Sequence, residues 1–365
     1  MLEDHFLQNV WYVVGWASEF QSGQPHGRTV AGQSVVLYRS SNGGLVALED
    51  RCAHRWAPLS FGRVEGDELR CMYHGVKFGP DGTCVAVPGQ DVVPASLKVR
   101  TYPIVEKHRF VWIWLGDAAR ADVSLIPDLN LLDEPERRLY CGHLDYEAHY
   151  LLITDNLLDL SHLGFLHEKT LGRRVDSATD NSPTRRFPAG SGAKSIPHGV
   201  RVDGWLPART VFLPKRVWSG DSWSCVDFFV PGIYKSYGRV YPSGMVEECE
   251  GRAPPSDRAS LCDAFSIQAV TPISRRKTRY FYSLGHRASD MEVAEADAMW
   301  QVVLDAFAED LRMIQAQQRI IDSSTGGRMG GIGADRGLVM FRNMMKRLIA
   351  AEGALAAGAE QGTDD

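Results

Sequence analysis

The chain has 365 residues, of which 44% are hydrophobic and 23% charged, and 40 basic against 45 acidic residues give a net charge of −5. This is the balance of an ordinary globular protein, and it disfavours nucleic-acid binding. No apolar run approaches the roughly 20 residues that a membrane-spanning helix needs. The acidic start, 1–5, lacks the basic and apolar regions of a signal peptide, which predicts a cytoplasmic protein. The length predicts two domains.

The first domain is expected to span 1–117 and to consist of small antiparallel sheets. Asn42-Gly43 and the turn sequence 79–82 each separate two apolar runs, as hairpin turns do. A further apolar run ends at residue 115, shortly before the expected end of the domain. The expected strands are 34–39, 45–48, 76–78, 83–87 and 110–115.

Two short loops in this region each offer one cysteine and one histidine. Cys52 and His54 form the first pair, and Cys71 and His74 the second. A zinc finger instead takes two cysteines from one loop and two histidines from a helix. A [2Fe–2S] cluster with mixed ligands needs two thiolates on one iron and two imidazoles on the other. The order Cys-x-His … Cys-x2-His is therefore typical of a Rieske centre, with a structural zinc site as the alternative.

Imidazole ligands raise the cluster potential from about −400 mV to about −150 mV or higher, which indicates a one-electron carrier. The other cysteines are odd in number and irregularly spaced, so a disulfide framework is not expected. We expect most of them to be buried apolar thiols: Cys84, Cys141, Cys225, Cys249 and Cys262.

The second half of the chain is predicted to mix helices and strands. Residues 118–140 are irregular and charged, and we place the domain boundary there. Residues 149–166 are predicted to be helical, and the polar stretch 173–204 is expected to be rich in loops. Strands are expected at 222–230, 265–270 and 278–284.

The longest helix is expected to begin at Ser289, which with Glu292 forms a capping box, and to end near Asp322. A short helix, 339–350, is expected to follow. The small polar tail, 351–365, is predicted to be disordered. The long helix has one apolar face, formed by Trp300, Val303, Leu304, Phe307, Leu311 and Ile314.

A second group of candidate metal ligands lies in 149–166. Asn156, Asp159 and His162 recur every three residues and would form one polar stripe on a helix. His162 and His167 are five residues apart, which in a regular helix is about 140° at 100° per residue. They can share one metal only if the helix widens or ends between them. The alternative is a helix with two unrelated histidines and a polar stripe at a subunit contact.

Two imidazoles and one carboxylate, with open positions, are the ligand set of non-haem Fe(II) oxygenases. The carboxylate is expected from the long helix, and the helical phase ranks its acids. Glu309 and Asp305 lie opposite the apolar face, whereas Asp310 lies at its edge and Asp297 is the next best placed. An acid against an apolar face is costly unless it is paired or metal-bound. Asp310 is therefore the predicted ligand, and a partly solvated acid is the alternative.

Together these motifs resemble the oxygenase component of the Rieske non-haem iron oxygenases, and most of all the group of vanillate and dicamba O-demethylases and toluenesulfonate methyl-monooxygenase. The resemblance covers nearly the whole chain. The matching segments are the four cluster residues, Asn156-x2-Asp159-x2-His162-x4-His167, Phe307-Ala-Glu-Asp310, Asn9–Val14 and Gln315–Asp322.

The resemblance implies an α+β protein in which a Rieske domain is followed by a helix-grip catalytic domain, 118–350, whose antiparallel sheet wraps around the long helix. It also implies a head-to-tail homotrimer. In that trimer Asp159 would bridge His74 of one subunit to His162 of the next, as a path for electrons. Asn156 and Asp159 are accordingly candidate catalytic residues.

The implied activity is that of the terminal oxygenase of a monooxygenase system. Its cofactors would be the [2Fe–2S] cluster and Fe(II), with O2 as co-substrate. A flavin/iron–sulfur reductase, with or without a ferredoxin, would supply electrons from NAD(P)H. The expected reaction is hydroxylation of a methyl or methoxy carbon of an aromatic substrate, most of all an aromatic acid, with O-demethylation when that carbon is a methoxy group.

Other activities remain open from the sequence. The same ligands would serve cis-dihydroxylation or monohydroxylation of an aromatic ring. A Rieske electron carrier would need only 1–117, and the further residues with their second metal motif argue against it. A scaffold subunit with a degenerate site is disfavoured because His162, His167 and a carboxylate candidate are all present.

The sequence offers fewer candidates for substrate contacts than for metal ligands. Gln268 matches a pocket position of the family by resemblance, and Tyr237, Arg239 and His286 lie near predicted strands. An aromatic acid in an apolar pocket needs Arg, Lys or amide donors. For each of these residues a surface or structural role is the alternative.

Overall fold

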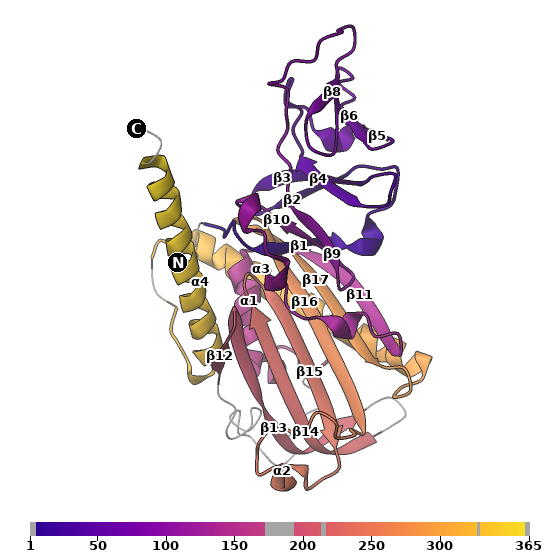
Figure 1. Ribbon diagram of the computed structural model, residues 1–365. Helices are drawn as coiled ribbons and strands as arrows, with labels where there is room; N and C mark the ends of the chain where they lie inside the picture. The colour runs from indigo at the N-terminus through magenta and orange to yellow at the C-terminus, as the bar shows by residue number, and fades with distance from the viewer. Residues whose placement is uncertain (1–4, 172–192, 213–216, 327–328, 362–365) are drawn as a thin grey trace. The chain divides into compact units, whose positions relative to one another are not determined.

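The structure is a computed structural model that describes residues 5–171, 193–212, 217–326 and 329–361 (Figure 1). The chain separates into two compact units. One, here called the Rieske unit, holds 3–128, 271–275 and the chain from 349 onward. The other, here called the catalytic unit, holds 129–270 and 276–348. None of the helices in the described ranges has the length and apolarity that crossing a membrane requires.

Within the described residues the Rieske unit contains three antiparallel sheets, as the sequence predicted. The predicted hairpin turn at Asn42-Gly43 is confirmed, with Gly43 at a φ of +84°. The first sheet is β1 (Trp11–Trp16), β10 (Phe110–Trp114) and β9 (Ile104–Lys107), and the second is β2 (His26–Val30), β3 (Gln33–Arg39) and β4 (Leu45–Glu49). The third is β5 (Arg63–Glu65), β6 (Glu68–Arg70), β7 (Lys77–Phe78) and β8 (Cys84–Ala86).

One apolar core of the Rieske unit lies directly behind the two cysteine–histidine loops. Leu59, Leu69 and Phe78 are fully buried there, and Cys52 and Cys71 belong to the same cluster. Because close-packed interiors resist movement, this core fixes the positions of both thiols before any metal binds.

The catalytic unit is built on a seven-stranded antiparallel sheet. Its strand order is β11-β17-β16-β15-β14-β13-β12 (Figure 1). The strands are β11 (Arg137–Tyr146), β12 (Lys194–Ile196), β13 (Gly199–Phe212), β14 (Val217–Phe229), β15 (Ile233–Tyr241), β16 (Cys262–Ser274) and β17 (Lys277–Arg287).

The strands β12 and β13 correct the expectation of loops throughout 173–204. Apolar Val200 and Val202 alternate with polar Arg201 and Asp203, which is the two-residue period of a strand. Proline and glycine earlier in the stretch obscured this period in the sequence. The part of the expectation that falls on 172–192 lies outside the described residues.

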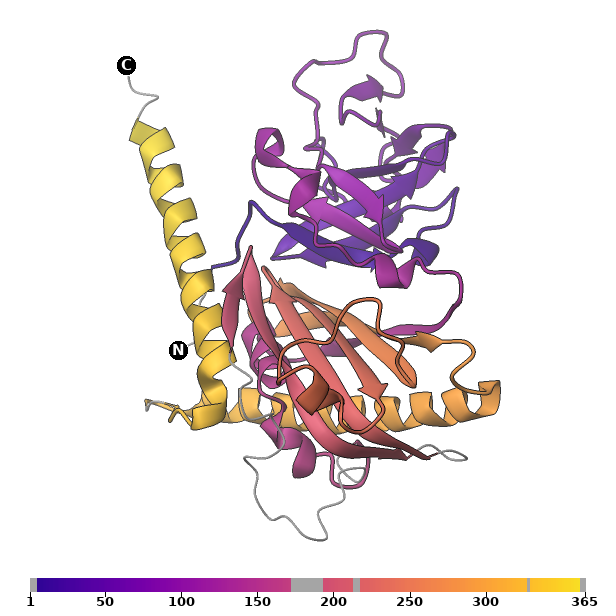
Figure 2. The same cartoon turned by 60° about the horizontal axis from the view of Figure 1, so that its bottom comes forward.

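Among the described residues the α-helices are α1 (Tyr150–Leu158), the short α2 (Met245–Glu248), α3 (Val293–Ser323) and α4 (Arg336–Gln361), and the 3-10 helix η6 (Leu160–Gly164) follows α1. α3 runs along one face of the sheet, here called the inner face (Figure 2). Tyr282 of β17 contacts Phe307 with ring centroids 4.7 Å apart, and Tyr140 of β11 stacks on Trp300 at 5.3 Å. These contacts confirm the predicted helix-grip arrangement.

The start of α3 differs from the prediction. The N-cap is Glu292, which forms a capping box with Glu295, and not Ser289. Asp290 is the reason, because its buried carboxylate accepts hydrogen bonds from the Arg287 side chain and holds the preceding residues in a turn. The predicted end near Asp322 is confirmed to within one residue.

α4 is longer than the predicted helix 339–350, and most of the tail that was expected to be disordered is helical. Glu352 gives the physical reason. Its two carboxylate oxygens accept the backbone N–H groups of Gln8 and Asn9 at 2.8 and 2.7 Å. The contact is more than three hundred residues away along the chain, so local composition does not reveal it. Residues 362–365 lie outside the described chain.

Candidate metal centres

The two cysteine–histidine loops have the same backbone hydrogen bonds. In the first, the Cys52 N–H donates to the Ala57 carbonyl and the Trp56 N–H to the Cys52 carbonyl, each at 2.9 Å. The second repeats this pattern from Cys71 at 2.8 and 2.9 Å. The fourth residue after each cysteine has a positive φ, 60° at Trp56 and 75° at Gly75. Two matched loops thus present matched ligands.

The four side chains are arranged in two pairs. Both thiols are 2% exposed, whereas His54 and His74 are exposed, with ring centroids 4.7 Å apart. Burial raises the pKa of the Cys52 thiol to about 11, and the neighbouring Cys71 thiol adds to the increase. A cluster with one iron held inside by thiolates and the other held outside by imidazoles fits this arrangement.

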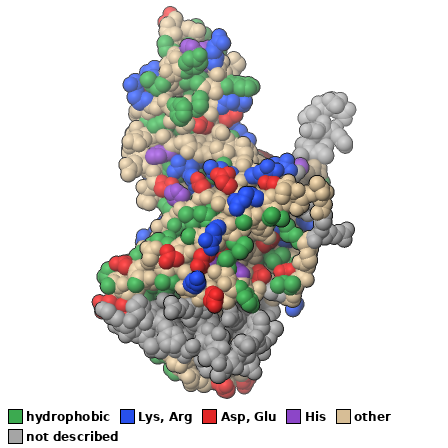
Figure 3. Space-filling view, turned by 180° about the vertical axis from the view of Figure 1, so that it is seen from behind, with side chains coloured by type: hydrophobic (Ala, Val, Ile, Leu, Met, Phe, Trp, Pro, Cys, Tyr) green, Lys and Arg blue, Asp and Glu red, His purple; other side chains and the backbone are tan. Residues whose placement is uncertain are grey.

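Large exposed apolar side chains lie close in sequence to the imidazoles, and the Tyr73 ring contacts that of His74 with centroids 4.0 Å apart. Figure 3 shows hydrophobic and histidine side chains together on this part of the Rieske unit. Four aromatic or methionine side chains are more than half exposed: Trp56, Phe61, Met72 and Tyr73. Exposed apolar clusters of this kind are typical of protein–protein contact sites.

The second candidate site begins where α1 ends. The predicted helical segment 149–166 is interrupted, because α1 stops at Leu158 and Asp159 adopts an extended backbone, φ −117° and ψ 94°, before η6 begins. The Asp159 carboxylate then accepts the Ser161 N–H at 2.9 Å and caps η6. η6 then ends at Gly164, between His162 and His167, so the two histidines are not held on one continuous helix and can turn toward one point. The sequence had required the helix to end between the two histidines, with Gly164 as the residue that would permit it, and this is confirmed.

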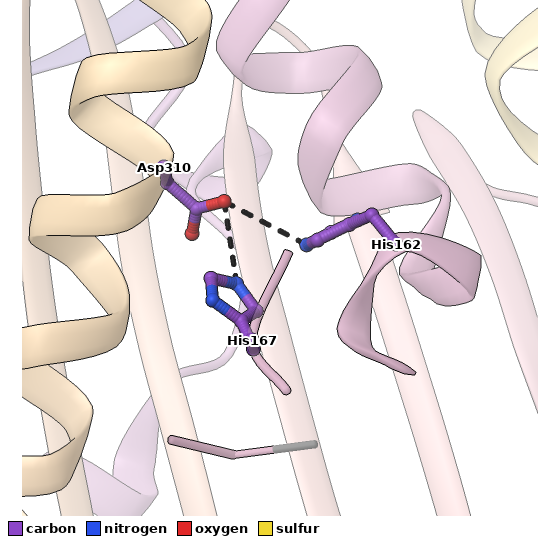
Figure 4. A group of neighbouring side chains, drawn as sticks. All are labelled: His162, His167 and Asp310. Carbon is purple, nitrogen blue, oxygen red and sulfur yellow. Dashed lines mark ion pairs between the residues drawn. The ribbon is translucent and has the colours of Figure 1, made fainter. Parts of the chain in front are cut away.

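His162, His167 and Asp310 come together at the inner face, with one ligand atom from each within 4.8 Å of the others. The Asp310 carboxylate oxygen Oδ1 lies 3.7 Å from His162 Nε2 and 3.3 Å from His167 Nε2 (Figure 4). His167 and Asp310 are buried, whereas the His162 side chain is 22% exposed. The predicted ligand set is brought together, and Asp310 is 7% exposed on α3.

The Nδ1 atom of each imidazole, which lies away from Asp310, already makes a hydrogen bond. His162 Nδ1 donates to the Asp159 carbonyl at 2.6 Å, and His167 Nδ1 donates to the Glu309 carboxylate at 2.8 Å. Since a carbonyl can only accept, His162 Nδ1 carries a proton and Nε2 keeps its lone pair in the neutral ring. Both rings therefore present Nε2 to the shared point, as metal-binding histidines do.

Glu309 is a site residue that the sequence analysis missed. Its carboxylate also accepts the Thr170 hydroxyl at 2.8 Å, so it ties the loop after His167 to α3. Burial alone would lower the pKa of His167, but hydrogen bonds to Asp310 and Glu309 raise it overall. The helical phase had placed Glu309 opposite the apolar face of α3, yet its side chain is only 22% exposed and contacts the buried His167. The signal that could have found it is its place beside Asp310, next to a histidine that needs an acceptor.

The other candidate residues lie as follows. Asn156 donates its amide to Asp310 at 2.9 Å and lies 3.4 Å from His162 Nε2, so it is part of the site. Asp297 is exposed and accepts the Tyr140 hydroxyl at 2.5 Å, away from the histidines. Asp305 is exposed as well and accepts from a neighbouring glutamine on α3.

Of the candidate substrate contacts, the structure brings only some to the inner face. Tyr237 pairs with Phe265, whose ring lies where a side chain at Gly285 would point. In β17, Gly285 is three residues from Tyr282, which faces α3, so Gly285 lies on the opposite, outer face of the sheet. Phe265 and its partner Tyr237 therefore project from the outer face, and so does Arg239, two residues after Tyr237. Tyr237 is therefore not beside the iron ligands.

Gln268 and His286 occupy the opposite, inner face and are buried. The His286 ring donates from Nδ1 to the Arg287 carbonyl at 2.8 Å, and its Nε2 has no hydrogen-bond partner among the described residues. Burial lowers the pKa of His286, so the ring is neutral near pH 7 and Nε2 is an acceptor.

Comparison with known proteins identifies the class. Residues 146–351 match the family model of the vanillate O-demethylase oxygenase C-terminal domain, and 10–103 match that of the Rieske [2Fe-2S] domain. The chain belongs to the Rieske non-haem iron oxygenases, as an oxygenase-component α subunit. The resemblance found in the sequence is thereby confirmed.

Relatives and solved structures match this chain over nearly its full length. The iron–sulfur subunit of the toluene-4-sulfonate monooxygenase system of Comamonas testosteroni is 37% identical over 348 residues, 95% of this chain and 98% of the relative. The dicamba O-demethylase oxygenase component of Stenotrophomonas maltophilia is 29% identical, covering 96% and 99%. The crystal structure of dicamba monooxygenase bound to 3,6-dichlorosalicylic acid matches with a TM-score of 0.82 at 27% identity, again covering 96% and 99%.

The residues present fit both metal groups of this class. Two buried thiols and two outward imidazoles suit the [2Fe–2S] cluster, and two Nε2 atoms with one carboxylate suit a mononuclear iron with open positions. The protein is thus an enzyme with a Rieske cluster and a His-His-Asp iron site.

Proposed function

We propose that this subunit is the terminal oxygenase of a monooxygenase system that hydroxylates a methyl or methoxy carbon of an aromatic substrate, in the first place an aromatic acid. The observation that carries the proposal is the His162, His167 and Asp310 site in a chain that also carries the cluster loops. The names of the relatives, toluene-4-sulfonate monooxygenase and dicamba and vanillate O-demethylases, support this reaction type.

The chain's own residues prepare the site. Iron bound there supplies the activation of dioxygen, which is chemistry of the metal and not of the protein. His162 and His167 are held with their Nε2 lone pairs facing Asp310, so the ligands need little reorganisation on binding. The buried rings of Tyr280, Tyr282 and Phe307 form an apolar wall on the inner face. Such a wall accepts an aromatic ring and excludes water.

Electron supply is the second part of the proposal. The relatives are named as components and subunits of larger systems, which supports a separate reductase. We propose a flavin/iron–sulfur reductase using NAD(P)H, with or without a ferredoxin. The cytoplasmic location expected from the sequence remains a prediction.

We further propose a head-to-tail homotrimer in which the cluster of one subunit serves the iron of its neighbour. A suitable contact surface is offered by four exposed apolar side chains close in sequence to the imidazoles, Trp56, Phe61, Met72 and Tyr73. Asp159 would then bridge His74 to His162 across the contact. Its backbone carbonyl already accepts from His162, so one residue would hold the histidine and pass the electron.

The test is NADH-dependent oxygen uptake by iron-reconstituted protein with a flavin/iron–sulfur reductase and a panel of methoxybenzoates and toluenesulfonates. Formaldehyde formed in step with oxygen consumption is the expected result for a methoxy substrate, and a benzylic alcohol for a methyl substrate. A cis-diol or ring phenol without formaldehyde would reassign the reaction to ring hydroxylation. Reduction of the cluster without any oxygenated product across the panel would overturn the proposal.

A further inference from the structure

A row of tyrosine and tryptophan rings, here called the aromatic row, crosses the inner face of the catalytic unit. Tyr280 and Tyr282 lie on β17, Trp300 on α3 and Tyr140 on β11. Neighbouring ring centroids along the row are 5.6, 5.7 and 5.3 Å apart in the order Tyr280, Tyr282, Trp300 and Tyr140. Each distance lies in the range of roughly 4.5–7 Å at which aromatic rings contact one another. The four rings therefore form one unbroken path.

The inner end of the aromatic row is Tyr280, which lies near the iron ligand Asp310. Phe307 is one helical turn before Asp310 on α3, and its ring contacts that of Tyr280 with centroids 5.6 Å apart. Burial raises the pKa of Tyr280, and the charges of Tyr146 and Asp310 add to the increase. The row thus begins within electrostatic reach of an iron ligand.

The outer end of the aromatic row is Tyr140. Tyr280 and Tyr282 are buried, whereas Trp300 and Tyr140 are half-buried. The Tyr140 hydroxyl donates to the carboxylate of exposed Asp297 at 2.5 Å. A carboxylate at hydrogen-bond distance can accept the phenolic proton when the ring loses an electron. The outer end therefore has the proton acceptor that oxidation of a phenol requires.

Packing alone does not require hydroxyl groups at the buried positions of the row. Burial raises the pKa of both Tyr280 and Tyr282. A buried hydroxyl costs free energy that phenylalanine in the same place would avoid. Tyrosine and tryptophan differ from phenylalanine because they can lose one electron to a strong biological oxidant. The row consists of the aromatic residue types that can be oxidised, and this favours a role in electron transfer.

We propose that the aromatic row is an electron path that protects the iron ligands when dioxygen is activated without a bound substrate. An oxidising equivalent left at the iron site then takes one electron from the row, and the electron deficiency moves outward to Tyr140. Tyr140 loses one electron and its phenolic proton, which the Asp297 carboxylate accepts. A thiol in solution donates a hydrogen atom to the Tyr140 radical, and Asp297 releases its proton to water. Two thiyl radicals formed in this way combine as a disulfide.

This protective role goes beyond the proposed hydroxylation, and a radical measurement tests it. The probe is hydrogen peroxide, added without substrate or reductase to protein that holds the cluster and the mononuclear iron, because peroxide supplies the oxidising equivalent directly. Samples frozen during the reaction are measured by EPR spectroscopy. The wild type is expected to form a tyrosyl radical, and protein that keeps the cluster but lacks the mononuclear iron is expected to form none.

Two variants test the outer end of the row. Tyr140→Phe removes one hydroxyl from a half-buried ring and should lose most of the radical signal. Asp297→Asn keeps every ring but replaces the exposed carboxylate that accepts the proton, so it should lower the radical yield as well. Tyr241→Phe is the matched control and should keep the wild-type signal, because Tyr241 belongs to a separate buried cluster with Trp205 and Trp223.

The protection itself is measured after the same exposure to peroxide. Trp300→Phe interrupts the row, so it should keep less iron-binding capacity at the His-His-Asp site than the wild type. Peptide mass spectra should show more oxidation of Tyr280 and Tyr282 in this variant. Trp205→Phe, in the separate cluster, is the matched control and should behave as the wild type.

Two outcomes would overturn the inference. One is a wild type that forms no tyrosyl radical although its mononuclear iron is verified as bound. The other is a radical yield and a loss of iron binding that are the same in Tyr140→Phe, Trp300→Phe and their controls. The assay needs no aromatic substrate, so either outcome leaves the proposed function to its own test.

Discussion

At the scale of single residues, two neighbouring acids on α3 have different tasks. Asp310 faces both imidazole Nε2 atoms, and Glu309 holds the far nitrogen of His167. The helical phase predicted the first, because a buried acid at the edge of an apolar face needs a partner. It did not predict the second, because Glu309 acts on a loop residue whose position depends on tertiary structure.

These roles are separable by substitution. Asp310→Asn should abolish mononuclear iron binding while the Rieske cluster remains. Glu309→Gln keeps the shape of the side chain but weakens the acceptor for His167, and iron affinity should fall about 10-fold to 100-fold. Iron titration of the metal-depleted site measures both. Equal iron affinity in Glu309→Gln and the wild type would contradict the positioning role.

His286 gives a pH prediction. Burial lowers its pKa below the usual 6.5, with Arg138 acting in the same direction and Asp290 and Asp263 opposing. The stability that depends on neutral His286 is therefore fully present above about pH 6.5 and is lost as the pH falls through the lowered value. Between pH 7 and 5 the wild type should lose more unfolding free energy than His286→Gln. Chemical denaturation at both pH values measures the free energy of unfolding of each protein. Equal losses in the wild type and in His286→Gln would refute the prediction.

At the scale of elements, the sequence predicted the type of each helix or strand better than the residues at which it begins and ends. The long helix, the hairpins and the strand 278–284 followed from periodicity and turn residues, since these are local signals. The end of α1 at Leu158, with Asp159 as its C-cap, and the full length of α4 did not. Each depends on a side chain that binds backbone groups: the Asp159 carboxylate at Ser161, and Glu352 at Gln8.

The role of Glu352 can be measured. Glu352→Ala leaves two backbone N–H groups of the N-terminal segment without their acceptor, so we expect about 1–3 kcal/mol lower unfolding free energy. Glu250→Ala removes an acid that is paired with Arg252 on the surface and should change stability by less than about 1 kcal/mol. Denaturant unfolding of the two variants gives the comparison. Equal stability of both would show that the end of α4 is not held by this contact.

At the scale of the whole molecule, the cluster and the iron site belong to different compact units of one chain. Their ligand motifs were predictable because metal chemistry fixes the residue types and spacing of each. How an electron passes from one to the other was not predictable in this way, because in the proposed trimer it depends on the contact between subunits. The proposed trimer assigns that step to Asp159.

Asp159→Ala should therefore leave both metals bound and stop substrate-coupled turnover, while the reductase still reduces the cluster. Asp159→Asn, which keeps the cap on η6 through its amide oxygen, separates loss of electron transfer from loss of local structure. Iron content, cluster reduction and product formation are measured together. Full turnover in Asp159→Ala would remove the residue from the electron path.

The most direct measurement of the central claim, that one chain holds a Rieske cluster and a separate His-His-Asp iron, is iron analysis with EPR spectroscopy on the wild type and on Asp310→Asn. The account predicts about three irons per chain in the wild type, two from the cluster and one mononuclear. In Asp310→Asn it predicts about two irons and an unchanged signal of the reduced cluster. An unchanged iron content in Asp310→Asn, or a wild type that binds cluster iron alone, would contradict it.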